Sequence, residues 1–103
     1  MNRLMLVAAT VMLPVSSPAA EIPPELWDRP RSAQTVMASS AIRQAVAAYH
    51  GDTAARIMIV HGPRQAAQAE ELRAWLVALA IDSARVFLRA DPAAGTISME
   101  TLK

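Results

Sequence analysis

The stretch Ile57–Trp75, which reads IMIVHGPRQAAQAEELRAW, decides the fold. Its first four residues are apolar, His61 follows, and a Gly-Pro pair then interrupts the run. A continuous apolar run bounded by turn residues is typical of a strand that is covered on at least one face. We therefore expect a strand at 56–61, a connecting turn "HGPR" and a helix that begins at Gln65.

The second half of the stretch has a helical period. Apolar residues recur at spacings of three and four and share one face of a helix over 65–80: Leu72, Trp75, Leu76 and Leu79. Charged residues, Glu70 and Arg73 among them, lie away from the centre of this face. The helix is predicted to pack on the sheet with Trp75 in the core.

Two further strands are expected downstream, at 85–90 with Val86 and Leu88 on one face, and at 96–102 with Ile97 and Met99 on one face. The strand at 56–61, the helix and the strand at 85–90 then form a β-α-β unit, whose strands run parallel. The short loop at 91–95 predicts an antiparallel hairpin between the last two strands.

A second helix is expected upstream, at 40–50, from the spacing of Ile42, Val46 and Tyr49. Residues 33–37 suit either a short strand or a first helical turn. Residues 33–103 are therefore expected to form a single small α/β domain. Its fold class is an α+β sandwich, in which a small mixed β-sheet carries two helices on one face and consists of the β-α-β unit plus the C-terminal hairpin.

The N-terminus has the pattern of a secretory signal peptide, expected at residues 1–20. Arg3 precedes a ten-residue apolar run, which is too short to span a bilayer, and small residues close it. Cleavage after Ala19 or Ala20 gives a periplasmic protein with no stable membrane insertion. The chain contains no cysteine, so lipoprotein modification and disulfide bonds are excluded.

Residues 21–32 read EIPPELWDRPRS and are expected to form an extended, Pro-rich arm. Trp27 is its large aromatic residue. The side chain either packs back on the domain, because an exposed tryptophan is costly, or contacts a partner. Trp27 is thus the candidate partner-binding residue.

The charge balance excludes two classes of partner. Ten Lys and Arg face nine Asp and Glu in the whole chain, and removal of Arg3 with the signal peptide leaves nine of each. Nucleic-acid binding and polybasic membrane contact both need clustered positive charge. We therefore expect no nucleic-acid partner.

The pattern of residues 40–90 resembles the second half of the OmpA-like peptidoglycan-binding domain. Ile57 and Ile59 match that family's I-x-I strand, Trp75-Leu76 stand at its aromatic-Leu pair, and Arg85-Val86 stand where an Arg enters the last strand. The family's Gly-Ile pair is Ala80-Ile81 here. The resemblance implies an α/β domain of the cell envelope.

The family's ligand residues are replaced. In the family, an Asp after the strand and an Arg on the helix hold the charged ends of a peptidoglycan stem-peptide residue. The Asp position is Arg64 here, the Arg position falls near Gln68, and the loop between them is almost absent. Peptidoglycan stays open as a partner although the motif residues are missing, and Arg64 is a candidate ligand-binding residue.

His61, at the end of the strand, is the second candidate ligand-binding residue. Catalysis would require a nucleophile or an orienting carboxylate beside it, and no such constellation occurs, so no catalytic residue and no enzyme activity are expected. His50, Asp52 and His61 are the alternative metal site, although their spacing matches no zinc motif. No cofactor is expected.

The function expected from the sequence is therefore that of a small, non-enzymatic periplasmic accessory or interaction protein of the cell envelope with a degenerate OmpA-like domain and an envelope-protein partner. The alternative is a periplasmic protein that binds a metal or a small ligand.

Overall fold

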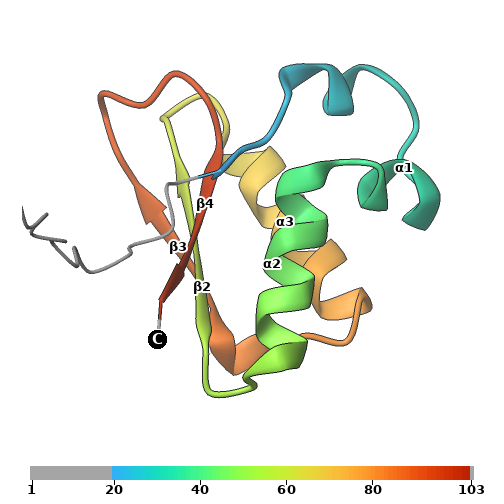
Figure 1. Cartoon of the computed structure of the whole chain (residues 1–103). Coiled ribbons are helices and arrows are strands. Elements are labelled where there is room, and N and C mark those ends of the chain that lie inside the picture. Colours follow the sequence, from blue (N-terminus) through green and yellow to red (C-terminus); the bar gives the residue numbers. More distant parts are fainter. Residues whose placement is uncertain (1–19, 103) are drawn as a thin grey trace, which may run out of the picture.

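Strand β2 (Arg56–His61) lies at the centre of the fold. The computed structural model describes residues 20–102, which form one four-stranded mixed sheet in the order β1-β4-β2-β3. The other strands are β1 (Ala20–Glu21), β3 (Val86–Ala90) and β4 (Ser98–Leu102). β2 is parallel to β3 and antiparallel to β4 (Figure 1). The predicted mixed sheet is confirmed, and so are the parallel strands of the β-α-β unit.

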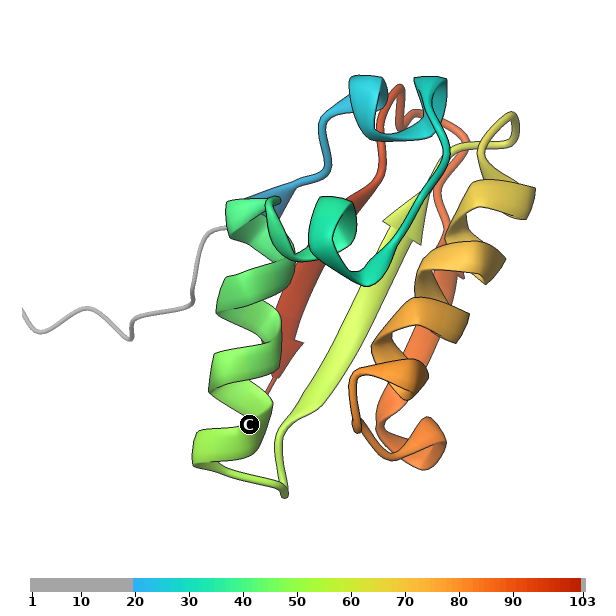
Figure 2. The ribbon, with the colours of Figure 1, turned by 90° about the vertical axis from the view of Figure 1, so that its right-hand side faces the viewer.

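Two long helices cover one face of the sheet, as expected. They are α2 (Ser40–Gly51) and α3 (Ala66–Ala78), and they lie side by side in front of the strands in Figure 2. Short helical segments complete the chain: η1 (Pro24–Asp28), α1 (Ala33–Met37) and η2 (Ser83–Arg85). Among residues 20–102 there is no helix both long enough and apolar enough to cross a membrane.

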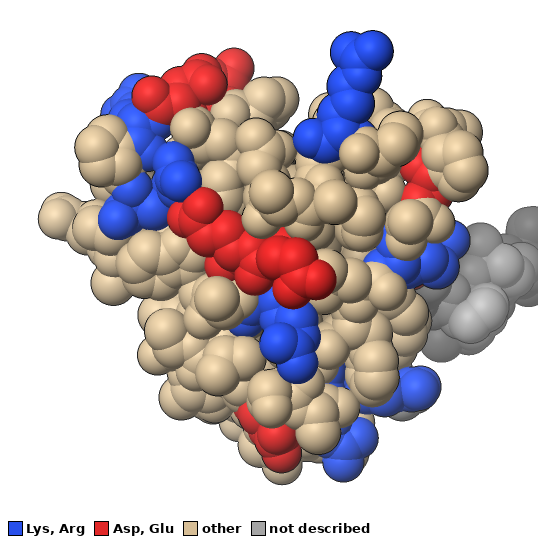
Figure 3. Space-filling model, turned by 180° about the vertical axis from the view of Figure 1, so that it is seen from behind, with Lys and Arg blue, Asp and Glu red and all other residues tan. Residues whose placement is uncertain are grey.

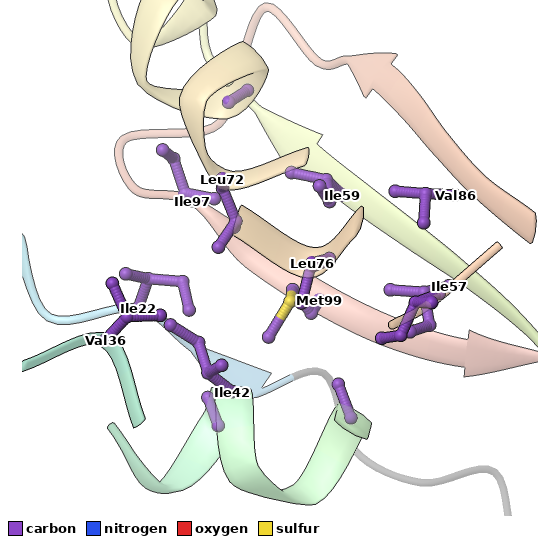
Figure 4. Close-up of a cluster of buried hydrophobic side chains, with 14 of the residues drawn as sticks. Ile22, Val36, Ile42, Ile57, Ile59, Leu72, Leu76, Val86, Ile97 and Met99 are labelled. Carbon is purple, nitrogen blue, oxygen red and sulfur yellow. The ribbon is translucent and has the colours of Figure 1, made fainter. Parts of the chain in front are cut away.

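The core lies between this helical layer and the sheet. Figure 4 shows side chains from both layers meeting in it, and the largest of the fully buried ones are Ile22, Val36, Ile42, Ile57, Ile59, Leu72, Leu76 and Ile81. Val86, Ile97 and Met99 are buried as the alternation predicted.

The prediction that Trp75 lies in the core is wrong. Trp75 is only partly buried at the edge of the core, and Leu72 and Leu76 fill the centre of the helix face. The indole N–H donates to the carboxylate of Glu71 at 3.1 Å. An indole has one polar group, so a position where that group reaches a partner near the surface suits it better than the dry interior.

The predicted C-terminal hairpin is also wrong. β4 does not pair with β3; it crosses to the other side of β2, where Met58 lies opposite Glu100. This arrangement gives β2, the most apolar strand, a partner on both edges and leaves no edge of it open. β3 and β4 are then separated by two strand spacings, about 10 Å, which the loop at 91–97 can span.

Gly62 makes this crossing possible. The loop passes over the end of β2, and a Cβ built on Gly62 would lie 2.2 Å from the backbone oxygen of Ala94 and 2.6 Å from Oε1 of Gln65. Neither distance is compatible with a side chain. The turn "HGPR" is therefore more than a connection, because its glycine admits the loop that places β4.

The expectation of an extended arm at 21–32 is wrong as well. β1 pairs Ala20 with Met99, and the N–H of Ile22 donates to the carbonyl of Ile97 at 2.8 Å. The η1 segment follows, so the arm begins as the edge strand of the sheet and then folds over the end of the domain (Figure 1). Ile22 is only 1% exposed, and its burial explains why the arm does not extend into solvent.

Residues 33–37, for which strand and helix were both open, form α1. Ser32 caps this helix: its hydroxyl accepts from the N–H of Thr35, and the hydroxyl of Thr35 accepts from the N–H of Ser32. This reciprocal pair satisfies two backbone donors at the helix start, which favours helix over strand. The predicted signal peptide lies outside the described residues except for Ala20.

Ala80 ends α3 in a left-handed conformation. Its φ is 74°, and the N–H of Ile81 donates to the carbonyl of Leu76 while that of Ala80 donates to Val77. These two bonds form a Schellman motif, whose C′ position is usually glycine because a Cβ is strained there. Ala80 is also the position of the family glycine in the resemblance described above.

Replacement of Ala80 by glycine is therefore expected to stabilise the domain. The relief of left-handed strain, about 1–2 kcal/mol, exceeds the entropy gained by the unfolded chain, so Ala80→Gly should raise the free energy of unfolding by about 0.5–1 kcal/mol. Ala74→Gly, in the exposed middle of the same helix, should lower it by about 1 kcal/mol. Urea unfolding measures both changes. If the free energy of unfolding changes in the same direction in the two variants, this account is contradicted.

Gly62→Ala should destabilise the domain. The new methyl group meets backbone rather than a flexible side chain, so the loop has to move, at a cost of about 1–3 kcal/mol. Gly51→Ala is the control, because Gly51 lies in α2 with open space around it, and this change should stabilise by about 0.5–1 kcal/mol. If thermal unfolding shows Gly62→Ala to be neutral, the loop does not pass where the structure places it.

Candidate functional site

A cleft of about 320 Å³ lies at the end of the sheet where the arm, the turn after β2 and the loop before β4 meet. Its walls come from three segments that are distant in the sequence, and its lining residues are Ile22, Pro24, Trp27, Asp28, Arg64, Gln65, Gln68, Gly95, Thr96 and Ile97. These segments gather at the upper end of the molecule in Figure 1. We call this hollow the arm cleft.

Gln65 holds two walls of the arm cleft together. Its side-chain oxygen accepts from the N–H of Gly62 at 2.9 Å, and its side-chain amide donates to the carbonyl of Gly95 at 3.0 Å. One amide thus links the turn after β2 to the loop before β4. Because both bonds are to backbone, the two segments are fixed relative to each other at the base of the cleft.

An ion pair fixes the third wall, which is the arm. The guanidinium of Arg31 binds the carboxylate of Glu71 on α3 through two bonds, at 2.7 and 2.9 Å. The same guanidinium donates to the carbonyl oxygens of Trp27 and Arg29. A bidentate pair is geometrically more specific than a single contact, so this interaction determines where the arm crosses α3.

Trp27 packs on its own domain, which is the first of the two placements expected for it. The side chain is half-buried against the core, and Cζ of Arg31 lies 5.4 Å from its ring centroid, within the range of a cation–π contact. The same ring lines the arm cleft. It is therefore a wall of a cavity rather than a free aromatic on an arm.

Two opposite charges border the arm cleft without pairing. Asp28 on η1 and Arg64 on the turn after β2 both line it and are both exposed. Neither forms an ion pair with any residue in the described part of the chain. Elsewhere on the surface, acidic and basic groups lie beside one another, as on the face in Figure 3.

Asp28 was missed by the sequence analysis. An extended arm would carry Asp28 away from Arg64, and 36 positions separate the two in the sequence, so no local pattern links them. The sequence contained one signal that the arm folds back on the domain: it carries the apolar residues Ile22 and Trp27 among its prolines, and such residues are usually buried.

His61 does not line the arm cleft. The residue is 8% exposed, and its Nδ1–H donates to the carbonyl of Gly62 at 2.9 Å. The bond fixes the ring at the end of β2 and leaves the histidine as a packed residue. The candidate ligand residues His61 and Arg64 therefore point to different surroundings, and only Arg64 belongs to the cleft.

The alternative metal site does not assemble. His50 and Asp52 lie at the end of α2, before β2 begins, whereas His61 ends β2. A six-residue strand separates these positions by about 16 Å at 3.3 Å per residue. Within residues 20–102 no cluster of three His, Cys, Asp or Glu side chains is arranged to hold a metal ion.

Comparison of the chain with protein-family models, with curated proteins and with solved structures finds no match. The OmpA-like resemblance thus depends on the residues quoted for it.

The Arg31–Glu71 pair predicts a pH dependence of stability. The hydrogen bond from Arg31 lowers the pKa of Glu71, and partial burial opposes this effect. A carboxyl group with a depressed folded-state pKa stabilises the fold fully above its unfolded pKa, about 4.3. This contribution is lost as the pH falls through the lower folded-state pKa.

The variant Arg31→Gln should therefore be less stable than the wild type near neutral pH, and the difference should shrink as the pH falls below about 4.3. Chemical unfolding at a series of pH values measures it. Arg64→Gln, which removes an unpaired guanidinium, is the matched control and should show no such trend. A difference between wild type and Arg31→Gln that stays constant down to low pH would contradict the pairing.

Proposed function

We propose that the mature chain is a small, non-enzymatic accessory protein of the cell envelope. It resides in the periplasm and binds a zwitterionic, amino-acid-like group in the arm cleft. The observation that carries this proposal is the pair of unpaired opposite charges, Asp28 and Arg64, on separate walls of one cavity.

The chemistry of the two charges defines the ligand. A guanidinium binds a carboxylate through paired N–H donors, and a carboxylate binds an ammonium group. The charged groups of Asp28 and Arg64 lie too far apart to pair with each other, so a ligand with both charges can lie between them. A ligand of a single charge would leave one of the two without a partner.

The remaining lining suits such a ligand. Trp27 supplies an apolar wall for a hydrocarbon chain, while Gln68 and Thr96 supply polar side chains. The wall positions are fixed by the Gln65 and Arg31 bonds described above, so little ordering is required on binding. A preformed cavity with a few placed polar groups is the usual form of a small-molecule site.

The resemblance to the OmpA-like domain favours a peptidoglycan stem peptide as the source of the zwitterion. That family holds such a group between an Asp after the strand and an Arg on the helix. Here an Arg stands at the Asp position, and the acidic partner comes from the arm instead. We infer a site with the same two charges, in which the positive charge stands at the family's Asp position and the negative charge comes from the arm.

The periplasmic location follows from the predicted signal peptide, and no enzyme activity is proposed. Within residues 20–102 both histidines hydrogen-bond only to backbone carbonyls, so neither activates a hydroxyl nucleophile. The metal-binding alternative lacks convergent ligands. An envelope protein remains the expected macromolecular partner. This proposal does not assign a surface of the domain to that partner.

The test is co-sedimentation of the mature protein with peptidoglycan sacculi, with free stem peptide as competitor. Competable binding is expected. Arg64→Gln and Asp28→Asn should each weaken it about 10-fold or more, because each removes one charge-assisted contact. The control is Arg56→Gln, because Arg56 is an exposed arginine at the start of β2, the opposite end of the strand from the arm cleft; this variant should bind as the wild type does.

A charge exchange sharpens the test. The double variant Asp28→Arg/Arg64→Asp again has one charge of each sign in the cleft, so binding should recover relative to either single reversal. The absence of sacculus binding by the wild type would overturn the proposed ligand. Binding that is insensitive to Asp28 and Arg64 would overturn the proposed site.

A further inference from the structure

The outer edge of β3 has no partner. β3 is the last strand in the sheet order and pairs with β2 alone, so the five residues Val86–Ala90 present unpaired backbone groups on their other side, as far as the described chain extends. Figure 2 shows β3 as the outermost strand on the side of α3. No proline or bulge interrupts this edge, and such edges pair readily with another strand.

Apolar side chains border the same edge. Val77 and Phe87, the two large hydrophobic residues exposed in the described part of the chain, are 38% and 40% exposed. Phe87 alternates with the buried Val86 and so lies on the face of the sheet that the helices leave uncovered. Its exposure places an apolar group beside a free backbone edge.

Val77 lies toward this edge from the helical layer. The side chain of Arg73, one turn earlier on α3, donates to the carbonyl of Ser83 just before β3, at 3.3 Å. The opposite flank of α3 faces the arm through Glu71. Residues four apart share one side of a helix, so Val77 lies on the flank toward β3.

Charge determines which strand could pair here. In an antiparallel pairing of β3 with its own copy around Leu88, Phe87 lies opposite Arg89 of the second copy. Arg85 and Asp91 flank β3 and come opposite each other at the two ends of the pairing; Arg85 also donates to the carbonyl of Ala54, and Asp91 also accepts from the N–H of Ala93. Opposite charges and an Arg-aromatic pair are both favourable across strands. A two-fold axis at Phe87 would instead set Arg85 against Arg89, and one at Arg89 would set two copies of that arginine together.

We propose that this edge is a homodimer interface, in which β3 of two copies pairs antiparallel around Leu88. The two sheets then join into one continuous sheet of eight strands with all helices on the same face. The α3 helices approach along the flank that carries Val77, and Phe87 loses its exposure. None of the interface residues lines the arm cleft, so the inference does not depend on the proposed ligand.

The experiment is sedimentation velocity of the mature protein over a range of concentrations. A concentration-dependent dimer is expected. Asp91→Arg sets two arginines opposite each other at both ends of the interface and should raise the dimer dissociation constant about 10-fold or more. Arg85→Asp should do the same through paired carboxylates, and circular dichroism checks that each variant is folded.

The double variant Arg85→Asp/Asp91→Arg restores both opposite-charge pairs across the two-fold axis and should recover the dimer. Arg56→Asp, an exposed charge reversal on the central strand β2 rather than on β3, serves as control. A monomer at all concentrations would overturn the proposal. A dimer that either single reversal leaves unchanged, or that the double variant fails to restore, would overturn the register and with it the interface.

Discussion

The approach of a loop to Gly62 is the constraint on which the rest of the structure depends. The loop before β4 passes over the end of β2 at a distance that admits no side chain. Because it passes there, β4 lies on the far side of β2 and presents an edge to which β1 adds. β1 in turn begins the arm, and the arm brings Trp27 and Asp28 to the cleft. A side chain at one position would therefore disturb the sheet order and the site together.

The arm itself is held by two different kinds of interaction. Burial of Ile22 supplies a non-directional contribution from apolar area, whereas the bidentate contact of Arg31 with Glu71 supplies direction. The ion pair is partly exposed, so its value lies in geometry more than in stability. It places the arm against α3 and so sets the width of the cleft between Asp28 and Arg64.

The sequence alone predicts the parts of the fold that depend on local periodicity. Ile57 and Ile59 in the strand and Leu72 and Leu76 in the helix follow from spacing, and the parallel β-α-β pairing follows from chain connectivity. The position of β4 could not be predicted this way, because short loops serve hairpins and strand crossings alike. Trp75 was misplaced since periodicity gives the direction of a side chain but not its depth.

The candidate site was predictable only in part. Arg64 follows from the turn after the strand, but Asp28 reaches the cleft through long-range pairing of β1, which no local pattern encodes. The arm was expected to extend because three prolines disfavour regular structure. Two of them stand at the start of η1. Backbone N–H groups there have no partner within the helix, so a proline, which has no N–H, is tolerated at that position.

The pairing of β1 with β4 has a consequence for the order of folding. These strands come from opposite ends of the described chain, so the rung between Ala20 and Met99 closes a loop that contains nearly the whole domain. Contacts of such sequence separation slow folding, because the loop entropy is lost before the contact forms. A chain that emerges N-terminus first, from a ribosome or through a membrane channel, cannot complete this sheet until its last strand has followed.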